Sequence, residues 1–280
     1  MKNLLTVLLM LAVSAGAVAH EAQRVVSVGF GVTQLIDALG AGEEIVAVDS
    51  TSKAFAKARN LPVLGYQRKL AAEGIIALKP TVVIGSEEMG PEVVLSQLKQ
   101  AGIAVVVLDG AQHNVSDLSA HIRTLGEQLD KKSQSAVLLD QVAQQQAQLA
   151  RGKQGGQRAV FLFLGEKGAL FAGGDATTAN GMFELIGLSN IAKGKTNYYP
   201  YGIETLIAEQ PKVVLISERS LAQDLNGILT KYPFLSQLKA TQNQCIFTVN
   251  GQALLGGFNL SSLAESVRLQ RAIAQNPACR

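Results

Sequence analysis

The chain has 280 residues, a length that fits one large domain or two lobes of ordinary size. Its 25 Lys and Arg residues against 22 Asp and Glu residues give a formal net charge of +3, which is too small to indicate binding to nucleic acid or to a membrane surface. The two cysteines, Cys245 and Cys279, either form a disulfide in an oxidising compartment or remain free thiols, and the sequence leaves both open.

Residues 1–19 have the layout of a secretory signal peptide. Lys2 gives a positive start, residues 4–18 form an apolar run too short to span a bilayer, and Ala17-Val18-Ala19 is a small-x-small cleavage site. No cysteine lies near this site, so we expect no lipid anchor. Because no later segment has the roughly 18 consecutive apolar residues of a membrane span, we expect a protein secreted into the periplasm.

An internal repeat divides the rest of the chain. Residues 73–87 align without gaps to residues 204–218, and eight of the fifteen positions are identical. Downstream of each copy, the sequence Leu-Ser-Gln-Leu-Lys occurs at residues 95–99 and again at 235–239. This order indicates two copies of one layout.

Each copy is expected to alternate strands and helices. Short β-branched runs at Val82–Ile84 and Val105–Leu108 are typical of strands buried on both faces of a parallel sheet. Between them, Pro91–Ala101 has helical spacing and ends at a glycine. The sequence therefore predicts two α/β lobes, an N-terminal one over 20–113 and a C-terminal one over 155–280.

The segment over 114–154 differs from the two lobes in having a helical pattern throughout, and it is expected to link them. Leu118, Ile122, Leu125 and Leu129 lie on one helical face, and Leu138 resumes a similar face. One long helix from Ser116 to about Ala150 would measure roughly 50 Å. The alternative is two helices broken near residues 130–133, and we favour the single helix.

Two Rossmann-like lobes with central parallel sheets, joined by a single long α-helix, resemble the class III substrate-binding proteins of ABC importers that carry vitamin B12, iron siderophores and haem. The resemblance is carried by Arg24-Val-Val-Ser27, Leu39-Gly40, the two repeats, and residues 173–190 with Ala-Asn-Gly and Leu-Ile-Gly-Leu-Ser-Asn. It implies a monomeric protein without enzyme activity that captures its ligand in the interlobe cleft. Its partner would be an inner-membrane permease dimer with its ATPase.

Within that class, the loop Leu64-Gly-Tyr-Gln-Arg-Lys-Leu70, followed by Glu73-Gly74, resembles the haem-binding branch. The resemblance implies that Tyr66 ligates the iron of Fe(III) protoporphyrin IX, and tyrosine is a known haem ligand. Arg68 can hydrogen-bond the phenolate or, with Lys69, reach a propionate. The structural alternative is a tyrosine packed on its own lobe beside two solvated charges.

The second lobe is expected to supply the other wall of the cleft. Tyr198, Tyr199 and Tyr201 lie close together, and aromatic rings stack on a planar macrocycle, although each of them can equally pack within its own lobe. The haem-binding branch often has a histidine after the first strand of the second lobe, where this chain has Gly165-Glu-Lys-Gly168. Lys167 and Arg219 are therefore predicted to pair with propionates.

Glu73 and Glu204 occupy equivalent positions in the two repeats, each at the start of a predicted short helix. A carboxylate at this position is favoured by the helix dipole, which is a sufficient structural explanation. The resemblance implies a second role, in which one glutamate from each lobe forms salt bridges with arginines of the permease dimer. Two equivalent carboxylates suit a receptor with two-fold symmetry, and we favour docking.

Two other functions remain open. One is the binding of vitamin B12 or an iron siderophore, within the same class of proteins. The other is a Rossmann-type enzyme, but the sequence lacks a P-loop and a Gly-x-Ser-x-Gly motif, and Gly29-Phe-Gly31 lacks the third glycine of a dinucleotide-binding loop.

Overall fold

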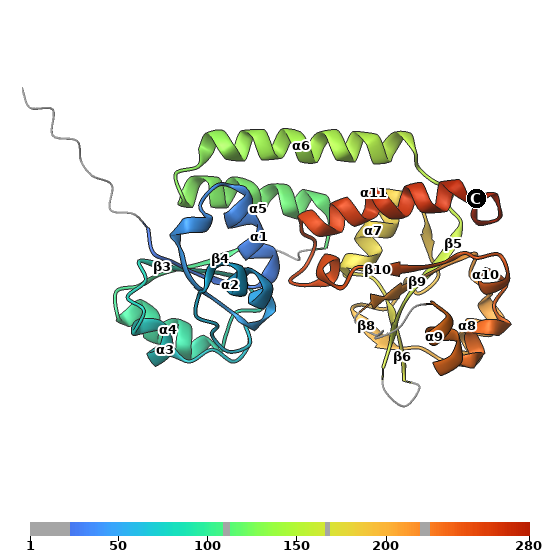
Figure 1. The fold of residues 1–280 in the computed structure, drawn as a ribbon, viewed down its shortest axis with the longest axis horizontal. Helices are drawn as coiled ribbons and strands as arrows, with labels where there is room; N and C mark the ends of the chain where they lie inside the picture. The colour runs from blue at the N-terminus through green and yellow to red at the C-terminus, as the bar shows by residue number, and fades with distance from the viewer. Residues whose placement is uncertain (1–22, 109–112, 166–168, 219–224) are drawn as a thin grey trace, which may run out of the picture.

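The computed structural model describes residues 23–108, 113–165, 169–218 and 225–280. Figure 1 shows two lobes side by side, with helix α6 lying across both of them. This two-lobed α/β architecture confirms the predicted fold class. The predicted signal peptide over 1–19 lies outside the described residues.

The first lobe contains a parallel four-stranded sheet with the order β2-β1-β3-β4. Its strands and helices are β1 (Val25–Val28), α1 (Phe30–Ala38), β2 (Ile45–Val48), α2 (Lys53–Arg59), α3 (Ala72–Ile76), β3 (Val82–Ser86), α4 (Glu92–Gln100) and β4 (Ala104–Leu108), with short 3-10 helices at Gly42–Glu44 and Ser50–Ser52. Both central strands are buried along their whole length, because helices cover the two faces of the sheet.

The second lobe contains a sheet with the order β10-β9-β5-β6-β8, and β7 pairs with β5. Its strands and helices are β5 (Arg158–Leu164), β6 (Leu170–Gly173), α7 (Thr178–Ile186), β7 (Ser189–Asn190), β8 (Tyr198–Pro200), α8 (Ile203–Glu209), β9 (Val213–Ser217), α9 (Leu225–Lys231), α10 (Lys239–Gln242), β10 (Ile246–Val249) and α11 (Leu260–Gln275), with 3-10 helices η5 (Pro233–Gln237), η6 (Gly251–Leu254) and η7 (Pro277–Cys279).

The second sheet is mixed, which corrects the prediction of a parallel sheet in both lobes. Strand β6 runs antiparallel to both β5 and β8. Only residues 165–169 separate β5 from β6, and a connection of this length permits a hairpin but no parallel crossover.

The linking segment forms two helices, so the prediction of one continuous helix from Ser116 to Ala150 is wrong. Helix α5 (Val115–Gln128) and helix α6 (Lys132–Arg151) are separated by Asp130, which has a left-handed backbone with φ +53°. The two helices pack closely at Gly126, where a side-chain carbon would lie 2.4 Å from Ser135 Cβ. The Ser135 hydroxyl donates to the Ile122 carbonyl at 3.1 Å.

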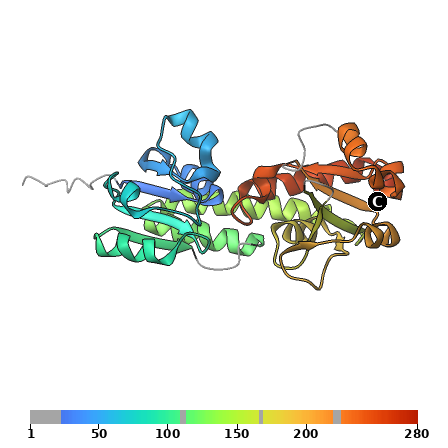
Figure 2. The ribbon, with the colours of Figure 1, turned by 90° about the horizontal axis from the view of Figure 1, so that it is seen from below.

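Helix α6 runs from the first lobe to the second (Figures 1 and 2). Its 20 residues span about 30 Å, against the roughly 50 Å of the predicted single helix. One apolar core runs beneath it through both lobes and includes Leu118 and Ile122 of α5, Val142 of α6 and Leu269 of α11. The lobes are thus packed together on the side of α6.

The repeat in the sequence corresponds to a repeat in the structure. Helix α3 precedes strand β3 in the first lobe as α8 precedes β9 in the second. Lys79 and Gln210, at equivalent positions before the two prolines, both have left-handed backbones, with φ +48° and +41°. The residue before the proline therefore has the same backbone conformation in each copy.

A disulfide joins Cys245, just before β10, to Cys279 in the C-terminal η7, with 5.5 Å between the Cα atoms. Both cysteines are fully buried. Of the two alternatives that the sequence leaves open, the structure has the bridged one.

We expect the double substitution Cys245→Ala and Cys279→Ala to lower the free energy of unfolding by about 2–4 kcal/mol, because the bridge closes a loop of 34 residues in the unfolded chain. Urea unfolding with and without a reductant measures this effect. The reductant should destabilise the unsubstituted chain and leave the double variant unchanged. Equal stability of both proteins in the absence of reductant would contradict this prediction.

Candidate functional site

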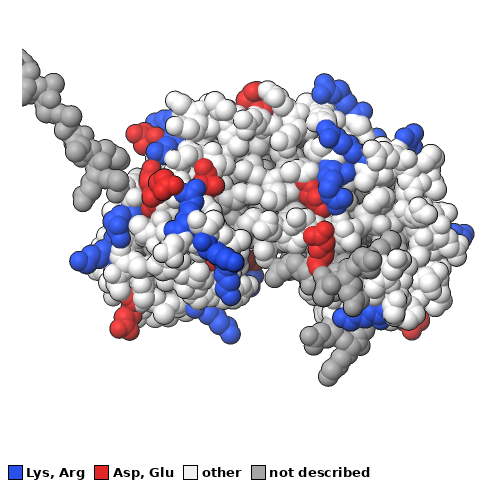
Figure 3. Space-filling view, in the orientation of Figure 1, with Lys and Arg blue, Asp and Glu red and all other residues white. Residues whose placement is uncertain are grey.

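The carboxyl ends of the parallel strands of both sheets meet at the junction between the lobes. Gly31, just after β1, lies against Gly256, just after β10 and η6, and a side-chain carbon at Gly31 would be 3.0 Å from the Gly256 carbonyl oxygen. Next to this contact, Gln34 donates through Nε2 to the Ser261 hydroxyl at 2.7 Å. Ligands of open α/β sheets bind outside the carboxyl ends of the strands, so this junction is the candidate site. Figure 3 shows the surface indented between the two lobes, with charged residues scattered over both.

The loop that carries Tyr66 follows helix α2 on the first lobe. The Tyr66 side chain is 45% exposed. The backbone of the loop is ordered by hydrogen bonds from Lys69 N to the Tyr66 carbonyl at 2.7 Å and from Leu70 N to the Gly90 carbonyl at 3.0 Å. The loop therefore presents an exposed phenol on a backbone that the β3–α4 turn supports.

Arg68 and Lys69 are exposed beside Tyr66, as the sequence predicts for solvent- or ligand-facing cations. The Arg68 guanidinium forms an ion pair with Glu88, and this carboxylate is the main cause that raises the pKa of Arg68. Tyr66 contributes to the same shift in pKa through its charge and a hydrogen bond.

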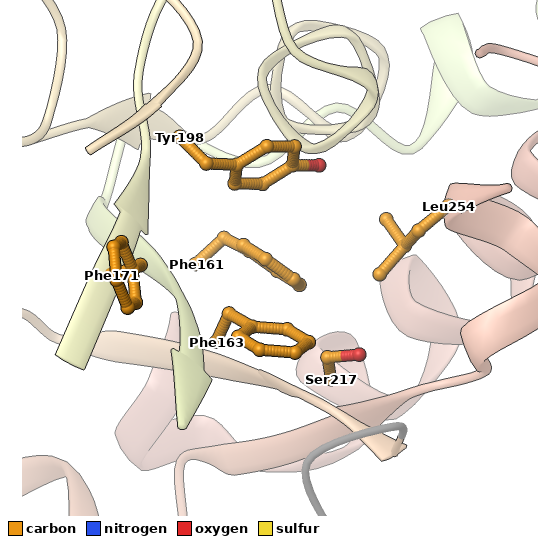
Figure 4. Close-up of a pocket in the computed structure, with 6 residues that line it drawn as sticks. All are labelled: Phe161, Phe163, Phe171, Tyr198, Ser217 and Leu254. Atoms are coloured by element: carbon orange, nitrogen blue, oxygen red, sulfur yellow. The ribbon is translucent and has the colours of Figure 1, made fainter. Parts of the chain in front are cut away.

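A pocket of about 400 Å³ opens on the second lobe, and most of its lining is aromatic. Figure 4 shows the rings of Phe161 and Phe163 of β5 between Tyr198 of β8 and Ser217 at the end of β9. The lining residues are Phe161, Phe163, Phe171, Tyr198, Ser217 and Leu254. Such a pocket can hold a flat apolar group and offers few polar contacts to it.

Tyr198 presents its ring to the pocket and buries its hydroxyl group. The residue is 44% exposed, its ring packs edge-on against Phe161 with 5.9 Å between centroids, and its hydroxyl lies near the backbone of Ala179. Burial of the hydroxyl raises the pKa of Tyr198 to about 12. The side chain is therefore a neutral phenol at physiological pH and is suited to stacking rather than to metal ligation.

The other predicted residues of the second lobe are placed differently. The Tyr199 hydroxyl donates to the Ala192 carbonyl at 3.1 Å, and its ring lies against Tyr201 and beneath Lys195, so it packs within its own lobe. Lys167 and Arg219 lie outside the described residues. Phe163, which is 38% exposed, is a pocket residue that the sequence analysis missed. Phe163 belongs to a continuous apolar strand, and the pattern of such a strand does not indicate which side chains face outward.

Glu73 and Glu204 are both exposed and lie in the first turns of α3 and α8. Neither carboxylate takes part in an ion pair between described residues. Helices α3 and α8 lie on the side of the molecule opposite α6, one on each lobe (Figure 1). The two carboxylates are thus available to a partner that contacts both lobes from that side.

The model of the periplasmic binding protein family matches residues 25–253. The chain belongs to this family. Its sequence is 37% identical to the periplasmic haem-binding protein HutB of Vibrio cholerae, with a TM-score of 0.84 over 90% of this chain and 99% of that one. It is 30% identical to a periplasmic haem-binding protein of Pseudomonas aeruginosa, with a TM-score of 0.79 over 89% of this chain and 92% of that one. It is also 27% identical to the vitamin B12-binding protein of Pectobacterium atrosepticum, over 83% of this chain and 85% of that protein.

As a periplasmic binding protein, the chain is a substrate-binding component of an importer and not an enzyme, and its location is the periplasm. In the part of the chain that the structure describes, no helix is long and apolar enough to cross a membrane. The same residues contain no group of three or more His, Cys, Asp and Glu side chains placed to hold a metal ion.

Proposed function

We propose that this periplasmic binding protein captures haem between its two lobes and delivers it to the permease of an ABC importer. The observation that carries the proposal is an exposed phenol, Tyr66, on the first lobe combined with an apolar aromatic pocket on the second. The phenolate of Tyr66 would ligate the ferric iron, and the pocket would hold one face or edge of the macrocycle. The similarity to two haem-binding proteins, at 37% and 30% identity, supports this choice of ligand.

Vitamin B12 is the second candidate, because curated relatives with 27% identity bind it. Its corrin ring is fringed with amide groups, which lose hydrogen bonds to water when they enter an apolar site. The pocket described here is lined by four aromatic rings and one leucine, with Ser217 as an additional polar group. This lining favours the flat apolar face of a porphyrin over a corrin.

Competition between the two ligands tests the proposal. We expect added hemin to produce a saturable change in the visible spectrum, with the charge-transfer band of a high-spin ferric phenolate complex. Excess cyanocobalamin should leave this spectrum unchanged. Displacement of hemin by an equimolar amount of cyanocobalamin would instead assign the site to vitamin B12.

The finer details of the site are part of the same proposal. Lys69, Lys167 and Arg219 would pair with the propionates, since cationic side chains match carboxylates. Cleavage after Ala19 would release a mature protein that starts at His20 and carries no lipid. The intact mass of the protein purified from the periplasm tests this start and the absence of a lipid.

Two substitutions at Tyr198 separate stacking from hydrogen bonding. We expect Tyr198→Phe to change hemin affinity by less than about twofold, because the ring remains and the lost hydroxyl is buried. Tyr198→Ala should weaken binding by about tenfold, because it removes the stacking surface. Hemin titrations of the two variants measure this difference. Equal losses in both would contradict the stacking role.

A further inference from the structure

A single carboxylate holds the two residues that follow Tyr66. Glu88, in the turn after β3, accepts a hydrogen bond from Gln67 Nε2 on one oxygen and from the Arg68 guanidinium on the other. The side chain of Glu88 is 41% exposed, whereas Gln67 is only 3% exposed. The Glu88 carboxylate thus links the buried side chain of Gln67 to the exposed guanidinium of Arg68.

The backbone of the same turn supports the loop from below. Gly90 N donates to the Gln67 carbonyl at 2.9 Å, and Leu70 N donates to the Gly90 carbonyl at 3.0 Å. The Gln67 side chain packs against Gly29 after β1, where a side-chain carbon would lie 3.2 Å from Gln67 Oε1. This oxygen has no hydrogen-bond partner among the described residues, so Gln67 depends on Glu88 for its side-chain hydrogen bond.

We infer that Glu88 is a positioning residue for ligand capture, because its carboxylate fixes Gln67 and Arg68 together and thereby fixes the loop that presents Tyr66. A free arginine side chain has many rotamers and can turn to solvent or to a propionate. The bond to Glu88 restricts Arg68 to one place in the Tyr66 loop before the ligand arrives. The inference rests on the proposed function, since it concerns how Tyr66 is presented to the iron.

The first test uses Glu88→Gln, which keeps the shape of the side chain and removes its charge and one acceptor. We expect hemin to dissociate about fivefold to tenfold faster from this variant, and the phenolate charge-transfer band to lose intensity. Glu92→Gln is the matched control, because it removes a negative charge from an exposed position nearby, in the first turn of α4. If both variants release hemin at the same rate, Glu88 acts only as a general charge and the inference is wrong.

A double-mutant cycle tests whether Glu88 acts through Arg68. In an Arg68→Gln background, the further substitution Glu88→Gln should change the dissociation rate less than it does in the unsubstituted protein, because the bond to Arg68 has already been removed and only the bond to Gln67 remains. An undiminished effect in that background would overturn the inference.

A measurement without ligand separates this inference from the proposed function. Hydrogen exchange of the peptide over 64–70 should be faster in Glu88→Gln than in the unsubstituted protein and unchanged in Glu92→Gln. Identical exchange in all three proteins would show that Glu88 does not position the loop, whatever the ligand is. Failure of the unsubstituted protein to bind hemin would reject the proposed function alone.

Discussion

Replacing Tyr66 with phenylalanine is expected to weaken hemin binding by more than about a hundredfold. The substitution retains the ring and removes the oxygen that would ligate the iron, and loss of even an outer partner of a metal ligand typically costs about 10–100-fold. The charge-transfer band of the ferric phenolate complex should disappear at the same time. A hemin titration followed by visible absorption measures both changes.

Tyr201→Phe provides the matched control for this experiment. Tyr201 follows β8, is half-buried against the core, and is absent from the lining of the aromatic pocket. The same loss of one hydroxyl there should leave hemin affinity and spectrum unchanged. An unaltered spectrum in Tyr66→Phe would remove Tyr66 as the iron ligand.

The second large effect is expected for transport. Removing both carboxylates with Glu73→Ala and Glu204→Ala should reduce hemin uptake by more than about tenfold. The reason is that each lobe would lose its predicted salt bridge with the permease. Hemin affinity should remain unchanged, since both residues lie in α3 and α8 on the side opposite α6 and outside the aromatic pocket. Uptake by cells and ATP hydrolysis by the reconstituted importer measure the effect.

The matched control removes two other exposed carboxylates, with Glu127→Ala in α5 and Glu184→Ala in α7. This variant has the same change in net charge and should support normal uptake. If the Glu73 and Glu204 double variant also supports normal uptake, the two glutamates serve only to begin their helices.

The sequence predicted the two-lobed fold because the repeat is strong. Both copies of the Glu…Pro segment form a short helix followed by a buried strand, α3 with β3 and α8 with β9. The break between α5 and α6 was harder to predict, because both helices bury their apolar faces in one core and so maintain a similar spacing of leucines. The decisive feature is the close contact of Gly126 with Ser135, which depends on tertiary packing.

The sequence indicated some residues of the candidate site and not others. Tyr66 and Tyr198 were chosen from the sequence and are exposed in the structure, whereas Phe163 and Glu88 were missed. Phe163 belongs to an apolar strand in which neighbouring phenylalanines differ in exposure, and the residue types alone give no sign of it. Glu88 is 20 residues from Arg68, and their ion pair depends on the parallel packing of β2, β1 and β3.

The most direct measurement is a crystal structure of the hemin-loaded protein with anomalous data collected at the iron absorption edge. We expect an iron peak at bonding distance from the Tyr66 oxygen, with the macrocycle against the rings of Phe163 and Tyr198. An iron peak bonded to another residue, or hemin bound away from the junction between the lobes, would contradict it.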